Sequence, residues 1–357
     1  TLDCASCISG PKMSSTVNHP NITIMAFSEI EGITRDGSGG FNAVVKEKAK
    51  FVDWAACTGC DACQIACTVA VPDQFNAHLA ARRAAYIPFP QAVPKKAVLQ
   101  REGTSPCIGA CPAGIKAHGY VSLVRSGKYE QAYQLVLDAT PLVGTLGRAC
   151  YAPCEGECTR GELEGPVPIR LIKRFASDQH HATHDGPGVE IPEPNGKRVV
   201  VVGSGPAGLT AAWQLARKGY AVRILEKRHE PGGYLRHAIP TYRLPQEVVE
   251  ADIDNLRAIG VEITCNATVQ DLASLKDEGW DAVVVATGTQ LATAMEIPGE
   301  QAIGVHTGLD FLRDVMNGAA PDFAGKRVVV IGGGNVAMDA ARVSRRLGAE
   351  DVRVAYR

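Results

Sequence analysis

The sequence predicts an α/β protein with two Rossmann-like dinucleotide-binding folds in tandem, preceded by an α-helical domain and a ferredoxin-like α+β region. A strand, a glycine-rich turn, a helix and a second strand follow one another from Arg198, and the same pattern returns from Arg327. All of the 12 cysteines except Cys265 lie before residue 160, in three groups. Grouped thiols in a chain of 357 residues are typical of metal binding rather than of a small disulfide scaffold.

The composition is that of an ordinary globular protein, with 45% hydrophobic residues, 21% charged residues and a net charge of −1. A balance so close to neutral gives no reason to expect nucleic acid or an anionic membrane surface as a partner. No apolar run reaches the roughly 18–20 residues of a membrane helix, and the first residues lack the pattern of a signal peptide. We therefore expect a cytoplasmic protein.

Short elements are predicted before residue 197. Residues 22–27 and 41–46 are expected as strands, with turn-forming residues between them. Residues 115–126 and 129–139 have helical periodicity. The polar stretch from His180 to Gly196 is rich in Pro, Gly and His, which indicates a linker.

Two βαβ units are predicted after residue 196, because continuous apolar runs are typical of parallel strands covered on both faces. The first unit is expected to have strands at 198–202 and 221–225, a helix at 209–218 and a later strand at 282–285. The second is expected to have strands at 327–331 and 352–356 and a helix at 336–347.

The first glycine-rich turn has the pattern of a dinucleotide cradle. Gly203 allows the tight turn, Gly205 lets the backbone approach a pyrophosphate, and Gly208 lets the helix pack closely on the sheet. The helix N-terminus offers free N–H groups to phosphates, and Glu226 ends the second strand, where a carboxylate can accept ribose hydroxyls. The alternative is a purely structural turn. The predicted cradle consists of Gly203, Ser204, Gly205, Pro206, Ala207 and Gly208.

The second turn predicts a nicotinamide site formed by Gly332, Gly334, Asn335 and Val336. Its second strand is followed by Arg357, which suits a 2′-phosphate and favours NADPH over NADH, unless it only ends a solvated strand. Two such folds suit a flavin and a nicotinamide, because hydride transfer needs their rings to stack. Thr287 and Gly288 form a small-residue turn where the chain can cross near the first nucleotide.

The densest cysteine run is typical of a [4Fe–4S] ferredoxin, with Cys57, Cys60, Cys63 and Cys67 at the bacterial spacing. Thr68 stands where that run has Pro, and the fourth Cys can serve another cluster, to which Cys4 and Cys7 could contribute. A zinc site and a redox disulfide remain alternatives. A later group could hold one cluster, or a structural zinc between two helices; it consists of Cys107, Cys111, Cys150, Cys154 and Cys158.

Residues 105–357 resemble the glutamate synthase small subunit and the N-terminal half of dihydropyrimidine dehydrogenase. The resemblance rests on residues 105–112, 146–158, 203–208 and 232–245. It implies FAD at the first fold, with contacts at Gly205, Pro206, Ala207, Glu226, Gly233, Tyr234 and Arg243. It implies NADPH at the second, with contacts at Gly334, Asn335 and Val336 and with Arg357 near the 2′-phosphate.

Departures from this family change the expected cluster count. Leu99, Glu102 and Leu146 stand where the family has cysteines, and Lys173 stands near its non-cysteine ligand, a role that a charged lysine cannot take. The resemblance therefore implies one cluster in the helical domain instead of two. Its expected ligands are Cys111, Cys150 and Cys154, with Cys107 or Cys158 as the fourth. Two clusters are expected in the whole chain, and three are possible.

Residues 1–100 resemble the A-type chain of heterodisulfide reductase, at residues 1–13, 18–22, 48–53, 57–67 and 86–94. The resemblance implies a fusion that is truncated at both ends, with an upstream flavin fold. The expected segments are 1–50, the tail of that module; 51–100, a ferredoxin-type region; 101–183, a helical iron–sulfur domain; 184–196, a linker; 197–300, the FAD-binding domain; and 301–357, the start of the NAD(P)H-binding domain.

These features predict an enzyme that moves electrons between NAD(P)H and [4Fe–4S] clusters through FAD. No side-chain acid or base is expected. The partner would be an electron acceptor, of the ferredoxin or disulfide-reductase type or a fused catalytic subunit, within a multi-subunit complex. Electron bifurcation is a hypothesis from the second resemblance. The alternative is a non-catalytic electron-wiring or scaffold subunit whose nucleotide folds are empty.

Overall fold

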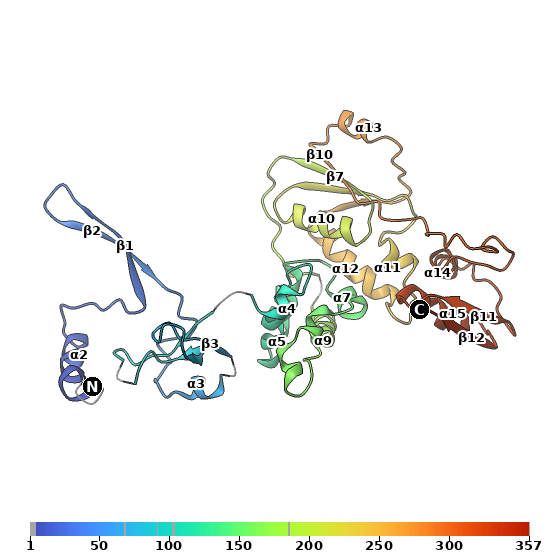
Figure 1. Ribbon diagram of the computed structural model, residues 1–357. Coiled ribbons are helices and arrows are strands. Elements are labelled where there is room, and N and C mark those ends of the chain that lie inside the picture. Colours follow the sequence, from blue (N-terminus) through green and yellow to red (C-terminus); the bar gives the residue numbers. More distant parts are fainter. Residues whose placement is uncertain (1–4, 68, 91, 102–103, 185, 357) are drawn as a thin grey trace. The chain divides into compact units, whose positions relative to one another are not determined.

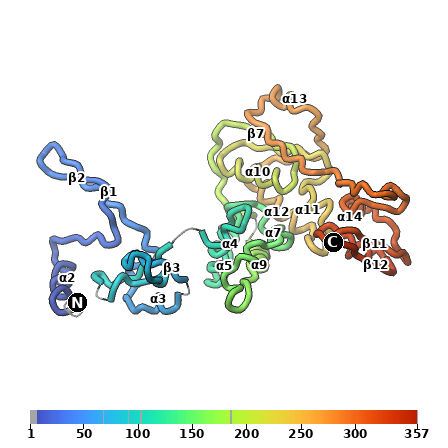
Figure 2. Tube along the Cα trace, in the orientation of Figure 1, coloured from blue at the N-terminus to red at the C-terminus, as the bar shows by residue number. Residues whose placement is uncertain are grey.

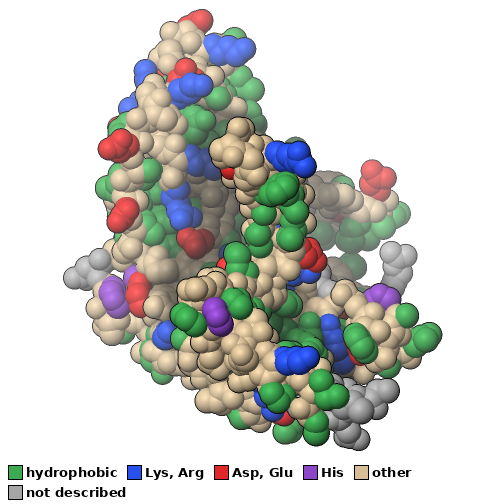
Figure 3. All heavy atoms as spheres, turned by 90° about the vertical axis from the view of Figure 1, so that its left-hand side faces the viewer, with side chains coloured by type: hydrophobic (Ala, Val, Ile, Leu, Met, Phe, Trp, Pro, Cys, Tyr) green, Lys and Arg blue, Asp and Glu red, His purple; other side chains and the backbone are tan. Residues whose placement is uncertain are grey.

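The computed structural model describes residues 5–67, 69–90, 92–101, 104–184 and 186–356. The chain forms two compact units, Thr1–Gly103 and Thr104–Arg357, which we describe separately (Figure 1). On the face shown in Figure 3, basic and acidic side chains are interspersed. Within the described part of the chain, every helix is too short or too polar to cross a membrane.

The first unit begins with two helical turns and a hairpin. The π-helix η1 (Ala5–Ser9) leads into α2 (Gly10–Val17). Strand β1 (Ser28–Arg35) pairs antiparallel with β2 (Phe41–Glu47), as the tube in Figure 2 shows. The Asp36 carboxylate closes the loop between them by accepting the N–H groups of Ser38 and Gly40.

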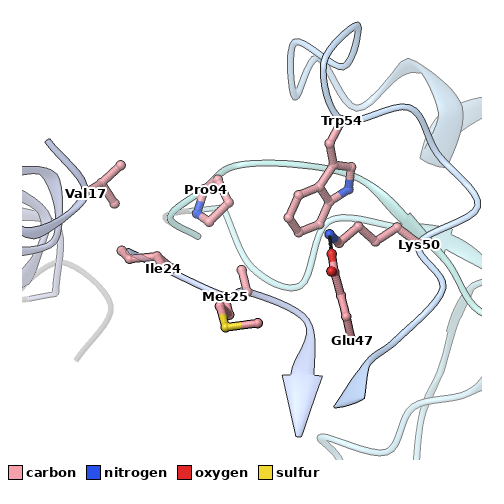
Figure 4. Close-up of a pocket in the computed structure, with 8 residues that line it drawn as sticks. Val17, Ile24, Met25, Glu47, Lys50, Trp54 and Pro94 are labelled. Carbon is pink, nitrogen blue, oxygen red and sulfur yellow. Dashed lines mark hydrogen bonds and ion pairs between the residues drawn. The ribbon is translucent and has the colours of Figure 1, made fainter. Parts of the chain in front are cut away.

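The strand predicted at residues 22–27 is wrong, because the hairpin ladder ends at Ser28 and only Phe27 of this segment continues it, by accepting the Lys48 N–H at 3.0 Å. The loop closed by Asp36 pairs Arg35 with Phe41, and the last pair of the ladder is Ser28 with Glu47. The apolar residues before Ser28 instead line a shallow pocket beside Trp54, where Ile24 and Met25 face it (Figure 4).

The rest of the first unit is small and irregular. Helix α3 (Ala62–Ala66) is accompanied by two antiparallel strand pairs, β3 (Ala70–Pro72) with β4 (Ala81–Arg83) and β5 (Ala85–Tyr86) with β6 (Val98–Leu99). Its core consists of Ile87, Ala92 and Ala97, with Val52 and Cys57 packed against them. The Trp54 indole fixes one side by donating to the Ala97 carbonyl.

The second unit starts with a helical region. Its elements are α4 (Pro106–Gly109), α5 (Ala117–Arg125), α6 (Tyr129–Leu137), α7 (Val143–Ala149), α8 (Pro153–Gly156), the 3₁₀ helix η2 (Thr159–Glu162) and α9 (Ile169–Thr183). Helices α5 and α6 confirm the predicted periodicity. The linker expected from His180 is wrong at its start, because α9 continues to Thr183 and His180 is buried against Tyr133.

The first predicted dinucleotide fold is present as a parallel sheet in the order β10-β7-β8-β9. The strands of this sheet and the helices between them are, in chain order, β7 (Arg198–Val202), α10 (Pro206–Ala216), β8 (Ala221–Leu225), α11 (Tyr234–His237), α12 (Gln246–Ala258), β9 (Glu262–Thr264), α13 (Leu272–Asp277) and β10 (Ala282–Val285). Strand β7 is buried from its second residue on, as its apolar run predicted.

The second dinucleotide fold contains α14 (Gly308–Met316), β11 (Arg327–Ile331), α15 (Asn335–Arg346) and β12 (Asp351–Ala355). Strands β11 and β12 pair in parallel around the second glycine-rich turn. The tandem α/β fold class predicted from the sequence is therefore confirmed.

The helical region and the first dinucleotide fold share one hydrophobic core. Trp213 of α10 is fully buried and donates its indole N–H to the Leu137 carbonyl of α6 at 2.9 Å. Asn255 of α12 donates to the Tyr133 hydroxyl at 3.0 Å. These contacts between distant parts of the sequence hold the two regions in a fixed arrangement.

Candidate cofactor sites

The turn after β7 has the close packing that the glycine pattern predicts. Gly203 has φ +103°, and a Cβ there would lie 2.4 Å from the Ala286 carbonyl oxygen. A Cβ on Gly208 would lie 2.0 Å from the carbonyl oxygen of Gly203. Only glycine fits either position, so the turn can bring the start of α10 directly onto the sheet.

The open side of the same turn is suited to a pyrophosphate. Gly205 is the N-cap of α10, and a Cβ there would meet no atom within 4 Å. The N–H groups of Ala207 and Gly208 lie in the first turn of α10, where a helix leaves its donors without intrahelical partners. Pro206 occupies the first helical position, where a missing N–H costs nothing.

Glu226 follows β8 and lies beside this turn. It is 6% exposed, accepts the backbone N–H of Ser204 at 3.0 Å and its hydroxyl at 2.5 Å, and accepts the Arg228 N–H at 2.9 Å. Burial would raise the pKa of this carboxyl group, but the hydrogen bonds from Ser204 and Arg228 lower it overall. An ionised acceptor therefore lies beside the Gly203–Gly208 turn, as the ribose of a dinucleotide requires.

Other predicted flavin contacts gather around the same turn. A Cβ on Gly233 would lie 2.8 Å from the Gly205 Cα, and the Thr287 Cα lies 3.2 Å from the Cβ position of Gly203. Gly288 has φ +67° in the turn that follows β10. The Tyr234 hydroxyl donates to the Thr289 carbonyl.

Arg243 has a different environment from the other predicted flavin contacts. Its guanidinium pairs at 2.7 Å with Asp339, a nearly buried residue of α15. The guanidinium groups of Arg342 and Arg346 lie over the ring of the preceding residue, Tyr242. Arg243 thus connects the first dinucleotide fold to the second.

The second turn repeats the geometry of the first. Gly332 has φ +121°, the Cβ position of Gly333 lies 3.2 Å from the Tyr356 ring, and Gly334 is the N-cap of α15 with open space at its Cβ position. Asn335 and Val336 begin the helix. Arg357 lies outside the described residues.

The Cys57 run winds through a tight loop into α3. Gly59 has φ +71°, and a Cβ there would lie 2.4 Å from the Lys95 carbonyl oxygen. The Ala97 N–H donates to Cys57 Sγ at 3.4 Å. The backbone N–H of Ala62, followed by the Thr58 hydroxyl, lowers the pKa of Cys60.

The other thiols of the first unit differ in their exposure. Cys63 is exposed and Cys67 half-buried, Cys7 is exposed, and Cys4 lies outside the described residues. The described cysteines are free thiols, as cluster ligation requires.

The later cysteines gather around one phenol. Burial is the first reason why the pKa of Tyr120 is raised, and the charges of Cys154, Cys111, Cys150 and Cys107 add to it in that order. Tyr120 and Cys154 belong to the same hydrophobic core, and Cys107 and Cys111 pack against it. Helix α4, which carries Cys107, packs against α8, which carries Cys154. Tyr120 itself gave no signal in the sequence beyond helical periodicity.

Two further groups suit a cluster at these thiols. The Ala152 N–H donates to Cys150 Sγ at 3.3 Å. Lys173 on α9 is only 5% exposed. Burial raises the pKa of the Cys154 thiol, and the charge of Lys173 opposes that effect. Lys173 therefore lies close enough to Cys154 to affect it, and Cys158 is half-buried beside η2.

Comparisons with known proteins agree with this geometry. Residues 197–357 match the pyridine nucleotide-disulphide oxidoreductase family, and residues 100–185 match domain II of dihydropyrimidine dehydrogenase, a 4Fe–4S cluster domain. Over these residues the chain has the iron–sulfur and dinucleotide-binding domains of that oxidoreductase class. The resemblance stated for residues 105–357 is thereby confirmed, whereas that of residues 1–100 stays a prediction.

The chain is similar in sequence to three curated relatives. It is 37% identical over 279 residues to the NADP(+)-dependent formate dehydrogenase subunit beta of Moorella thermoacetica, which covers 71% of this chain and 40% of that protein. It is 36% identical over 258 residues to glutamate synthase [NADH] of Schizosaccharomyces pombe (68% and 12%). It is 33% identical over 256 residues to the NAD-dependent dihydropyrimidine dehydrogenase subunit PreT of Salmonella typhimurium (70% and 60%). The chain thus spans less than two thirds of each relative.

Proposed function

We propose that this chain belongs to an enzyme that moves electrons between NAD(P)H and [4Fe–4S] clusters through FAD. The observation that carries the proposal is the pairing of a complete dinucleotide cradle with a group of four thiols inside one compact unit. When bound, FAD would accept the hydride of NAD(P)H and pass its two electrons singly to clusters, and the one proton of the hydride would go to solvent.

The protein residues bind and orient these groups. The start of α10 would hold the FAD pyrophosphate, Glu226 the ribose hydroxyls, and Gly334 with the start of α15 the nicotinamide dinucleotide. The proposed ligands of one cluster are Cys107, Cys111, Cys150 and Cys154, because the first two pack against the core that contains Cys154, and Cys150 ends α7 four residues before it. The Cys57 run would hold the other cluster.

Choice of nicotinamide and partner is also part of the proposal. We propose NADPH on the strength of Arg357 at the end of the second fold, although the relatives named above include NADP-, NADH- and NAD-dependent proteins. Two of them are named as subunits. We infer that a cytoplasmic partner of the ferredoxin or disulfide-reductase type, or a fused catalytic subunit, accepts the electrons.

The test is anaerobic purification of the protein with its clusters and flavin, followed by iron, sulfide and flavin analysis. We expect about eight iron and eight sulfide per chain, as two four-iron clusters require, together with bound flavin whose visible absorption bleaches on addition of NADPH. Zinc without sulfide would overturn the cluster assignment. Bound flavin that neither NADPH nor NADH bleaches would overturn the catalytic role, and clusters without any flavin would favour the electron-wiring subunit whose nucleotide folds are empty.

A further inference from the structure

A buried histidine at the end of α9 faces two hydrogen-bond acceptors. The His180 side chain is 1% exposed. Its Nδ1 lies 2.7 Å from Oε2 of Glu130, and its Nε2 lies 3.0 Å from the carbonyl oxygen of Gly186. A backbone carbonyl cannot donate, and an ionised carboxylate cannot either.

Nδ1 of His180 and Oε2 of Glu130 are ligand atoms that can share a proton or bind a metal ion. A neutral imidazole has one N–H, so if Nε2 donates to Gly186, the lone pair of Nδ1 points at a carboxylate oxygen. Their separation of 2.7 Å is that of a hydrogen bond. A metal ion bound at about 2.0–2.2 Å from each atom would replace the proton and move the two atoms apart. Which of the two is present decides what this cluster does.

A second histidine converges on the same carboxylate oxygen. His184 lies one helical turn after His180, and the two rings are parallel within 5° with centroids 5.2 Å apart. Its Nδ1 lies 3.5 Å from Oε2 of Glu130. One ligand atom from each of Glu130, His180 and His184 lies within 4.8 Å of the others. Two histidines four residues apart with a carboxylate form a known type of metal-ligand set.

Neighbouring groups orient these ligands as outer-shell groups do in metal sites. The Gly186 carbonyl can accept the Nε2–H of His180, which turns Nδ1 toward the Glu130 carboxylate. Gln134 donates its amide to Oε1 of Glu130 at 2.7 Å and to the Pro187 carbonyl at 2.6 Å. Oε2 of Glu130 is thereby left for the two histidines.

We propose that Glu130, His180 and His184 bind a divalent transition-metal ion, with Zn²⁺ as the best match. Zinc takes imidazole nitrogen at about 2.0–2.1 Å and carboxylate oxygen at about 2.0–2.2 Å, and it completes four-fold coordination with water at an open position. His184 is half exposed, so that position faces solvent, and its ring exchanges its contact with the Thr183 hydroxyl for the metal. The ion joins α6 to α9.

The site is chemically distinct from the cysteine groups. Its donors are imidazole and carboxylate, which suit zinc, whereas thiolates also hold iron–sulfur clusters. It lies at the start of the segment that leads to β7, and Gln134 and His180 hold that segment at Pro187 and Gly186. Metal binding therefore tightens the connection between the helical region and the first dinucleotide fold.

The test uses the protein with its clusters loaded, so that cluster thiols are occupied, and ZnCl₂ as the probe. We expect tight binding of one Zn²⁺ that His184→Ala and Glu130→Gln each weaken by about tenfold or more, because each removes one ligand. The matched control is His181→Ala, a neighbouring histidine on the same helix, which should change the affinity by less than about twofold.

X-ray absorption at the zinc edge identifies the donors. Scattering at about 2.0–2.1 Å without sulfur supports the proposal, whereas zinc–sulfur distances of about 2.3 Å overturn it. Equal zinc affinity in the wild type and both ligand variants also overturns it. Iron content and circular dichroism verify that each variant is folded, and Glu130→Gln keeps the test decisive if His184→Ala is not.

Discussion

Replacing Asp252 by Asn should change how the stability of the second unit depends on pH. Asp252 lies on α12 and is fully buried. Its carboxylate accepts the N–H groups of Gly144 and Thr145, at 3.0 and 2.7 Å, at the start of α7. This contact joins the first dinucleotide fold to the helical region, and the side chain has no solvent to stabilise its charge.

The expected magnitude follows from the pKa of this group. Burial raises the pKa of Asp252 from 3.8 to about 7, against the opposing effect of the two N–H groups. Between these values the folded protein binds more protons than the unfolded chain, so stability falls as pH rises from about 4 to about 7. At about 1.36 kcal/mol for each tenfold change in proton affinity, the loss is on the order of 4 kcal/mol.

The asparagine side chain of the Asp252→Asn variant cannot ionise, so the variant should lack this loss. The single amide oxygen of asparagine can accept only one of the two N–H groups that the carboxylate accepts. The lost hydrogen bond lowers the free energy of unfolding by about 1–3 kcal/mol at every pH. About 3 kcal/mol of the pH-dependent loss in the wild type falls between pH 4.5 and 7.5. The melting temperature of Asp252→Asn relative to wild type should therefore rise by about 6 °C over that range, at about 2 °C per kcal/mol for a unit of this size.

The assay is thermal unfolding of wild type and variant across this pH range, at fixed cluster and flavin content. The matched control is Asp254→Asn on the same helix, where solvent surrounds the carboxylate and the same change of atoms should have a much smaller effect. A difference between Asp252→Asn and wild type that stays constant with pH would refute the reasoning.

Three further predictions concern the cradle, the shared core and the cluster ligands. Gly208→Ala places a Cβ 2.0 Å from the Gly203 carbonyl oxygen, so the purified protein should lose most of its flavin, measured as flavin per chain. Trp213→Ala should lower the free energy of unfolding by about 3–5 kcal/mol in denaturant, and Trp213→Phe, which loses the indole donor, by less. Cys107→Ala should remove about four iron per chain if Cys107 is the fourth ligand, whereas Cys158→Ala should retain them.

Local patterns explain which parts of the fold were predictable. The two βαβ units could be recognised because their strands and turns are contiguous in sequence, and Gly203 and Gly208 are glycines for steric reasons that act within a few residues. The strand expected at residues 22–27 had the right composition. The prediction failed because the hairpin loop fixes the register of β2 against β1, and in this register the ladder ends at Ser28.

Long-range contacts explain what could not be predicted. His180 looked like part of a polar linker, but its ring stacks on Tyr133, 3.7 Å away, and α9 extends to Thr183 as a result. Arg243 is expected beside the flavin from the family resemblance, but its ion pair with Asp339 of the second dinucleotide fold had no signal in the sequence. No periodicity connects residues so far apart in the chain.

The shared core of the second unit bears on the proposed electron transfer. The four thiols around Tyr120 and the Gly203–Gly208 cradle belong to one compact unit, and the contacts made by Trp213 and Asp252 tie the two regions together. Their separation is therefore set by packing and not by a flexible linker. The Cys57 run belongs to the other unit. Under the proposed function, packing variants such as Trp213→Phe should for this reason slow electron transfer to the thiols around Tyr120 more than they alter the Cys57 run.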